Sequence, residues 1–291
     1  MYYKTTAYRM FNACNILFLL CVSVLCFLPI VHVIAVSFSS GAAATGNLVK
    51  FWPIGFNIDN YIQTLHSRNF AGAFGVTILR TVLGTAVSML LCITAAYPLS
   101  KENSYFRGRT VYAWYFVITI LFHGGLIPSY IVIVSTGLKN TIWAMVLPGA
   151  VAVFNVVLML NFFRNIPKEL NEAAQIDGCS HLRILFSIYF PISMPSIATL
   201  SLFTIVGHWN SWFDGMIYME PNKQPLATLI QALISKNDYT RVDMTPAIIK
   251  NMSQTGLKAT QIFIGALPIL LAYPFLQKYF VKGMTLGSVK Q

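Results

Sequence analysis

The residues of this sequence that could do chemistry gather near position 210, inside an apolar stretch. They are His208, Trp209, Asn210, Trp212 and Asp214. Aromatic faces combined with hydrogen-bonding side chains are the groups that binding of a sugar requires. On one continuous helix, residues four apart share a face, which would place Asn210 above Asp214 and His208 beside Trp212. The alternative is an aromatic belt at a membrane interface, whose polar groups satisfy one another.

Composition indicates that these residues belong to a membrane protein. Of the 291 residues, 56% are hydrophobic and only 10% are charged, which is too little polar surface to cover a soluble globule. Several stretches reach the roughly 20 apolar residues that a helix needs to cross a bilayer. The net charge of +11 comes from Lys and Arg scattered between these stretches, without the dense basic patch of a nucleic-acid-binding domain. The expected partner is a lipid bilayer, and no nucleic acid is expected.

The apolar stretches predict an all-α integral membrane fold with six spans in a single domain, 1–291. The predicted spans are 11–38, 70–100, 111–134, 141–163, 192–219 and 259–281. The first span is too long for the apolar core of a cleaved signal peptide, so it is expected to be retained. Basic residues in the N-terminal tail and after the second span predict that both termini are cytoplasmic. The longer segments are then 165–191 in the cytoplasm, and 39–69 and 220–258 outside.

Polar residues inside the predicted spans are candidates for a transport path. A charged residue at membrane depth is costly, so Asp214 is expected to serve function or to meet a buried partner. His123 lies in a Gly-Gly and Pro interruption of the third span, where freed backbone groups must face protein or water. A kink that admits a neighbouring helix would explain the same residues. The others, for which a hydrogen bond between helices is the simpler role, are Arg80, Asn155, Asn161 and Gln261.

No motif for catalysis is found. The run from Gly41 to Gly46 has the glycine spacing of a phosphate-binding loop, but Asn47 and Leu48 stand where that loop has Lys and Ser or Thr. A plain flexible loop is expected there. The sequence shows no zinc motif and no nucleophile with a paired base. The chain is therefore expected to be non-catalytic and to bind no metal or cofactor itself.

Segment 165–191 is predicted to form two short amphipathic helices around a glycine turn. Pro167 begins the first helix, Glu169 and Glu172 lie near its positive dipole end, and Gly178 ends it. The second helix, about 182–189, runs into a proline. Such a compact shape suits the groove of another protein. The alternative is an interfacial hairpin without a partner.

The same segment resembles the EAA motif of bacterial ABC importer permeases. That pattern is Glu-Ala-Ala, three residues, Gly, nine residues, Ile, one residue, Leu-Pro, and only Phe190 departs from it, in place of Leu. The resemblance implies that the segment docks on a separate ATPase. The residues implied for this coupling are Glu172, Ala173, Ala174, Asp177, Gly178, Ile188 and Pro191.

Similarity to the carbohydrate branch of these permeases, of the maltose and complex-oligosaccharide type, extends over most of the chain, including 122–128, 267–274 and, more weakly, the tail 282–291. It implies a sister permease, an ABC ATPase dimer that binds ATP and Mg, an extracytoplasmic solute-binding protein and an oligosaccharide substrate in the bacterial cytoplasmic membrane. The binding protein would meet 220–258. Basic outer loops would attract an acidic sugar such as a uronate oligomer, although an acidic partner protein would explain them equally.

Two alternatives from other classes remain open from the sequence. An ion-driven secondary transporter would show inverted repeats and several deep acidic residues, whereas Asp214 is alone and no repeat is visible. A polytopic membrane enzyme would need a clustered catalytic set at one membrane face. Neither accounts for the EAA spacing.

Overall fold

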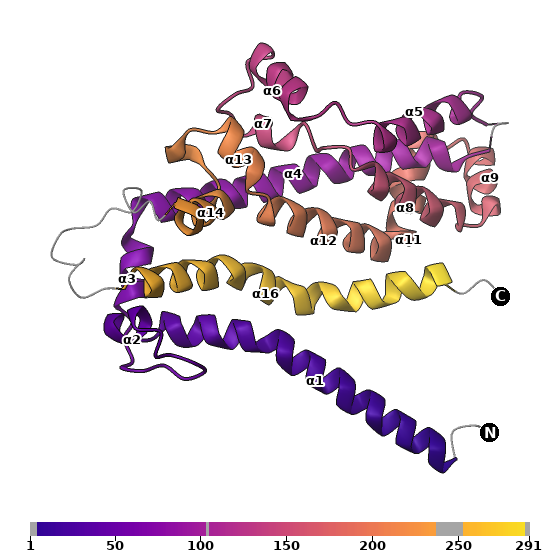
Figure 1. Ribbon diagram of the computed structural model, residues 1–291. Coiled ribbons are helices and arrows are strands. Elements are labelled where there is room, and N and C mark those ends of the chain that lie inside the picture. The colour runs from indigo at the N-terminus through magenta and orange to yellow at the C-terminus, as the bar shows by residue number, and fades with distance from the viewer. Residues whose placement is uncertain (1–4, 103–104, 237–252, 289–291) are drawn as a thin grey trace. The chain divides into compact units, whose positions relative to one another are not determined.

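All regular structure in the described residues is helical (Figure 1). The computed structural model describes residues 5–102, 105–236 and 253–288, with side chains throughout except at 236 and 275–288. The chain divides into two compact units. Unit 1 combines residues 1–71 with 232–267, and unit 2 combines 72–231 with 268–291.

Unit 1 contains α1 (Thr6–Ser37), α2 (Gly41–Thr45), α3 (Asp59–His66) and the first part of α16 (Gln254–Ser288). Its small apolar cluster joins the end of α1 to α2 and α16. The prediction of a flexible loop from Gly41 to Gly46 is wrong, because the short helix α2 covers Gly41–Thr45. Three consecutive alanines, the residue with the highest helix propensity, explain the helix.

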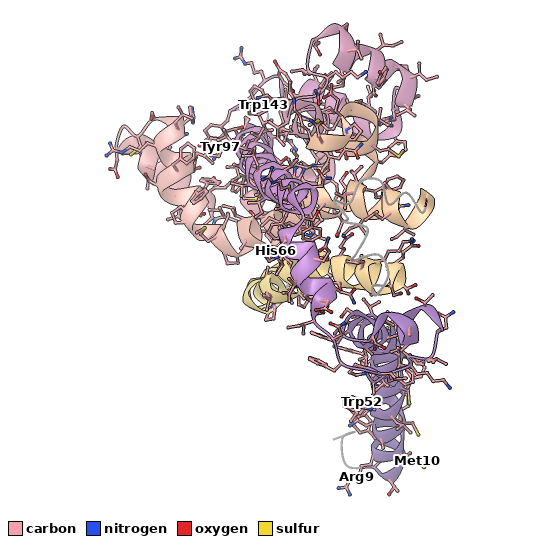
Figure 2. The ribbon with its side chains drawn as sticks, turned by 90° about the vertical axis from the view of Figure 1, so that its left-hand side faces the viewer. Arg9, Met10, Trp52, His66, Tyr97 and Trp143 are labelled. Carbon is pink, nitrogen blue, oxygen red and sulfur yellow. The ribbon has the colours of Figure 1, made fainter. Side chains whose placement is uncertain are left out.

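The side chains of α1 stand out from the helix on all sides, beginning at Arg9 and Met10 (Figure 2). Its most apolar window of 18 residues has a mean hydropathy of 2.8 and contains no buried residue. A helix that is apolar all round and covered by none of the described chain must face lipid or another subunit. Burial begins only at its last residues, Ala35 to Ser37.

Unit 2 is built around most of α4 (Arg68–Ser100). The elements that follow it along the chain are α5 (Arg109–Leu121), α6 (Leu126–Ser135), α7 (Trp143–Val146), α8 (Val153–Arg164), α9 (Lys168–Ile176), α10 (His181–Ile184), the π-helical turn η2 (Leu185–Tyr189), α11 (Phe190–Ile192), α12 (Met194–Asn210), α13 (Phe213–Tyr218), the 3₁₀ turn η3 (Pro221–Lys223) and α14 (Leu226–Lys236), whose end belongs to unit 1.

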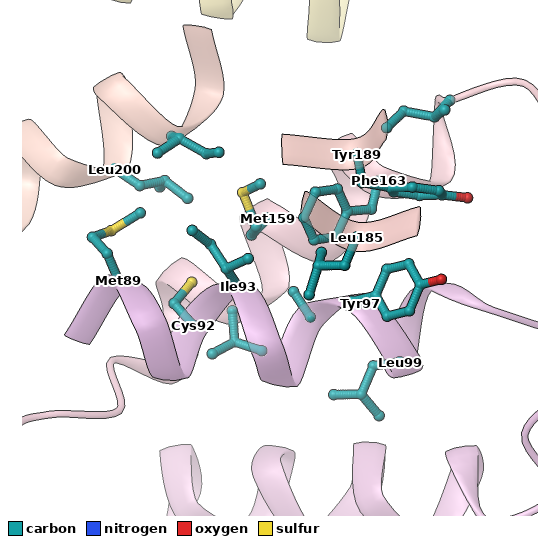
Figure 3. Packing of buried hydrophobic residues seen from close by; sticks show 14 of the residues in the cluster. Met89, Cys92, Ile93, Tyr97, Leu99, Met159, Phe163, Leu185, Tyr189 and Leu200 are labelled. Atoms are coloured by element: carbon teal, nitrogen blue, oxygen red, sulfur yellow. The ribbon is translucent and has the colours of Figure 1, made fainter. Parts of the chain in front are cut away.

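The main apolar core of unit 2 joins α4 to α8, α9, η2 and α12 (Figure 3). Tyr97, Phe163 and Tyr189 meet edge to face in this core, with ring centroids 5.1 to 6.4 Å apart. Ala174 of α9 is buried in the same cluster. The core therefore fixes the segment 165–191 to the long helix α4.

Within the described residues, three helices are long and apolar enough to cross a membrane: α1, α4 and α16 as far as residue 274. Two bent pairs raise this number to five if each is one span. α5 and α6 meet at 114°, and His181–Ile192 meets α12 at 84°. The prediction of an all-helical membrane protein is confirmed, and the predicted break at His123 is present, with Gly125 at a positive φ of 86°.

Two of the predicted spans are not continuous helices. In 141–163, helix is lost from 147 to 152, where Pro148 and Gly149 separate α7 from α8. In 192–219, α12 ends at Asn210 and Ser211 adopts an extended conformation before α13 begins. The predicted pairs Asn210 with Asp214 and His208 with Trp212 therefore do not share one helix, so that prediction is wrong.

Candidate functional site

A buried ion pair joins α4 to the start of α13. Arg80 is only 2% exposed, and its Nη1 donates to Asp214 Oδ1 at 3.1 Å and to the Ser211 carbonyl at 2.9 Å. Its Nη2 pairs with Asp214 Oδ2. The Ser211 hydroxyl and the Gly215 amide each donate to Asp214 Oδ1 at 2.9 Å. Asp214 thus has a buried partner of opposite charge, as expected for a charged residue inside a predicted membrane span.

This ion pair lies in the wall of a cavity of about 650 Å³ within unit 2. A volume of this size falls in the range of about 300–1,000 Å³ that ligand pockets occupy. Phe203, Phe213 and Tyr218 supply aromatic surface to the wall. Its principal polar residues are Arg80, Ser88, His123, Asn155, His208 and Asp214.

The predicted path residues divide into two groups. His123, Asn155, His208 and Asp214, which come from three different predicted spans, line this cavity together. The residues Trp209, Asn210 and Trp212 do not line it. The Trp209 ring lies edge-on to Phe74 at 5.9 Å, that of Trp212 lies edge-on to Phe213 at 5.5 Å, and Asn210 is exposed.

Contacts between helices hold the polar wall in place. The His208 ring is hydrogen-bonded to the backbone of Gly84, and a Cβ at position 84 would lie 2.5 Å from His208 Nε2. A glycine is therefore required for this approach of α12 to α4. Asn155 Nδ2 lies 3.3 Å from Thr204 Oγ1, which ties α8 to α12. Asn155 thus combines the helix-to-helix role with a place in the wall.

Two buried polar groups of the wall have no hydrogen-bond partner in the described part of the chain: Arg80 Nε and the Ser88 hydroxyl. A buried donor without a partner costs about 1–3 kcal/mol, so such groups call for an explanation. A ligand rich in hydroxyl groups would supply the missing partners. Ser88 was not singled out by the sequence reasoning, although Thr77, Thr81, Thr85 and Ser88 follow a helical spacing that marks a polar face on α4.

The EAA segment forms the predicted pair of short helices. α9 begins after Pro167 and ends before Gly178, which has a φ of 74°. Glu172, Ala173 and Asp177 are exposed, whereas Ala174 is buried and Ile188 packs against the core. Pro191 lies in α11, just before the 84° bend. The outward surface also includes Leu170 and, at 87% exposure, Ile176, both of which sequence reasoning missed.

Comparison with known proteins assigns this arrangement to a family. Residues 88–286, more than half of the chain, match the family described as "Binding-protein-dependent transport system inner membrane component". The chain belongs to this family of ABC importer permeases. The permease is thus a non-catalytic, multi-pass inner membrane component of a binding-protein-dependent system, and the ion-driven transporter and the membrane enzyme are excluded.

Relatives of known name place the permease in the carbohydrate-import branch. It is 39% identical to Protein LplC of Bacillus subtilis, over 99% of this chain and 97% of that one. It is 37% identical to the polygalacturonan/rhamnogalacturonan transport system permease protein YtcP of the same organism, over 97% and 99%. A chain in the crystal structure of a bacterial ABC transporter involved in import of the acidic polysaccharide alginate matches with a TM-score of 0.87 and 29% identity, over 96% of the permease and 100% of that chain.

A second polar site of the permease ties α9 to the end of α4. Lys101 Nζ lies 2.7 Å from Asn171 Oδ1 on α9 and 2.7 Å from the Tyr189 hydroxyl. The same ammonium lies over the Tyr189 and Tyr97 rings, 4.1 and 4.5 Å from their centroids, which is the geometry of a cation–π contact. The sequence alone does not predict this network, because the partners of Lys101 lie 70 and 88 residues away along the chain.

Replacing Lys101 by methionine is expected to change how stability depends on pH. Partial burial lowers the pKa of Lys101 to about 8, whereas an unfolded lysine titrates near 10.4. Between these values the unfolded state holds more protons than the folded state, so the Lys101 contribution to stability rises with pH. The melting temperature of the wild type minus that of Lys101→Met should increase from about pH 8 to about pH 10. A constant difference would contradict the assignment.

Proposed function

We propose that this permease forms half of the import path for an oligosaccharide and that the transported saccharide is acidic, of the uronate type. The observation that carries the proposal is the cavity beside Arg80 and Asp214, with its aromatic wall and its unpartnered Ser88 hydroxyl and Arg80 Nε. Aromatic faces and free hydrogen-bonding groups together suit a sugar ring with many hydroxyl groups.

The acidic character of the substrate has two supports. One relative is named for polygalacturonan and rhamnogalacturonan, and a structural neighbour belongs to an importer of alginate, which its title calls an acidic polysaccharide. The predicted outer segments also carry an excess of basic residues, including Lys50, Arg68 and Lys223. A positive entrance raises the local concentration of an anionic substrate. Inside the cavity, Arg80 is already neutralised by Asp214, so the wall itself is expected to recognise hydroxyl groups more than charge.

The proposed transporter has three kinds of protein partner. A sister permease completes the path, an ATPase dimer that binds ATP and Mg docks on α9, and a solute-binding protein delivers the saccharide to 220–258, of which 237–252 lie outside the described residues. In this arrangement the permease has six spans, with 141–163 crossing as a broken segment and both termini in the cytoplasm. The tail 282–291 would contact the ATPase dimer, although its side chains are not among those described.

Motion at α9 has a direct route to the cavity. Lys101 holds α9 through Asn171 and stands one residue past the end of α4. The same continuous helix carries Ser88 and Arg80, the latter about 30 Å away at 1.5 Å per residue. A push by the closing ATPase on α9 would therefore move α4 and change access to the cavity from one side of the membrane to the other.

ATPase stimulation tests the saccharide class. The permease, purified with its partner subunits in lipid nanodiscs, is mixed with the binding protein and either a uronate trisaccharide or a neutral trisaccharide. We expect the uronate oligomer to stimulate ATP hydrolysis strongly and the neutral sugar to leave it near its basal rate. Equal or greater stimulation by the neutral sugar would contradict the acidic assignment while leaving the importer assignment intact.

A further inference from the structure

Two cavities of unit 2 meet at the end of α4, on the side of α9 and far from the proposed path. One, here named the charged cavity, has a volume of about 310 Å³ and is lined by Lys101, Arg109, Arg164 and Lys168 among others. The second, here named the apolar cavity, has a volume of about 330 Å³. Lys101 and Tyr105 line both, so the two cavities adjoin one another.

The charged cavity has an excess of positive charge. Its four cations face only two carboxylates, those of Glu102 and Glu172. Lys168 pairs with Glu102, which removes one cation and one carboxylate from this balance. Arginine forms planar, bidentate hydrogen bonds with phosphate groups, and lysine binds them as a point charge. A phosphate is therefore the chemical group that this cavity fits.

The apolar cavity has the mostly apolar wall that a hydrocarbon chain requires, and its polar members are Thr94, Gln175 and His181, besides the shared Lys101 and Tyr105. Its wall includes Pro98, Phe106, Leu182 and Leu185, and Leu182 is 67% exposed. Tyr97 also lines it. This tyrosine is 7% exposed, and its hydroxyl has no hydrogen-bond partner among the described residues. An ester oxygen between a headgroup and an acyl chain would satisfy that hydroxyl.

We propose that the two cavities together form a binding site for an anionic phospholipid, with its phosphate in the charged cavity and an acyl chain in the apolar cavity. A free phosphate ion would fill only the first cavity and would leave the Tyr97 hydroxyl and the exposed Leu182 uncovered. Basic pockets between membrane helices are known to bind phospholipid headgroups. Because Lys101 and Glu172 border the site, the bound lipid lies beside the segment expected to meet the ATPase.

Lipid titration in nanodiscs tests this proposal. The permease, with its partner subunits, is placed in phosphatidylcholine discs that contain increasing fractions of phosphatidylglycerol, and lipid retention is followed by native mass spectrometry together with the melting temperature. The variant Arg109→Gln/Arg164→Gln should need about 25-fold more phosphatidylglycerol for the same retention, since each of the two cations near a membrane surface contributes about fivefold. The control Lys50→Gln/Lys139→Gln removes two exposed cations that line neither cavity and should match the wild type.

Tyr97→Phe separates lipid binding from folding. Removing a buried hydroxyl that has no partner should not destabilise the lipid-free protein. If an ester oxygen binds there, the variant should retain less phosphatidylglycerol and gain less stability from it. Equal retention in the wild type and both site variants would overturn the proposal. The proposal would also be overturned if inorganic phosphate alone raised the melting temperature as much as phosphatidylglycerol does, because the site would then bind a free anion.

Discussion

Replacement of Asp214 by asparagine is expected to destabilise the permease by about 3–5 kcal/mol, the usual cost of removing one partner of a buried ion pair. The reason is that Arg80, at 2% exposure, would keep its charge without a counter-ion, and a guanidinium cannot lose its proton in a protein. Arg80→Met should cost less, since the remaining Asp214 is part-exposed and still accepts hydrogen bonds from Ser211 and Gly215. Thermal melting in detergent gives the comparison.

The double variant Arg80→Met/Asp214→Leu provides the control. Replacing both charges by apolar groups removes the unpaired charge, so much of the lost stability should return. Melting of Asp214→Asn at the wild-type temperature would show that the pair is not needed for the fold. If the double variant folds but fails to transport, the charges also serve the path.

A charge on the outward surface of α9 is expected to release the ATPase. Ile176 is 87% exposed, so Ile176→Asp should leave the fold of α9 unchanged, yet it would place a carboxylate in the proposed interface. An unpaired charge desolvated at an interface costs about 2 kcal/mol or more, which corresponds to a loss of retained ATPase of more than about tenfold. Co-purification, with quantification of the ATPase and of the sister permease, measures this.

Gly178 offers a matched pair of variants for the same claim. Its φ of 74° is left-handed, a conformation that Asn and Asp tolerate better than other side chains, and no atom lies within 4 Å of a Cβ built there. Gly178→Asp and Gly178→Asn share the backbone strain and differ only in charge. The aspartate variant should lose the ATPase and keep the sister permease, while the asparagine variant keeps more of both. Loss of both subunits in both variants would point to misfolding.

Local signals in the sequence predicted the EAA segment well. Pro167 and Gly178 mark the ends of α9 by their backbone preferences, and the structure places the helix between them. The break at His123 followed in the same way from two glycines and a proline. Where local signals competed, the prediction failed. The apolar run 141–163 predicts one continuous span, but the helix is interrupted at Pro148 and Gly149. The glycine spacing at 41–46 predicts a loop, but the three alanines between the glycines form a helix.

The site could be predicted only in part, because its contacts join distant residues. Asp214 and Arg80 were each recognised as polar residues at membrane depth, but they lie 134 residues apart, and nothing in the sequence pairs them. The break at Ser211 has no adjacent glycine or proline to indicate it, which is why the sequence wrongly predicts one continuous helix that pairs Asn210 with Asp214 and His208 with Trp212. The polar network of Lys101 likewise depends on the packing of η2 and α9 against α4.

The central proposal is that this permease transports an acidic oligosaccharide, driven by ATP hydrolysis in its partner subunits. The most direct test is uptake of a labelled uronate trisaccharide into vesicles that contain the complete assembly and its binding protein. We predict uptake only when ATP is present on the side of α9, and weak uptake of a neutral trisaccharide under the same conditions. Uptake driven by a proton or sodium gradient without ATP, or equal uptake of the neutral sugar, would contradict the account.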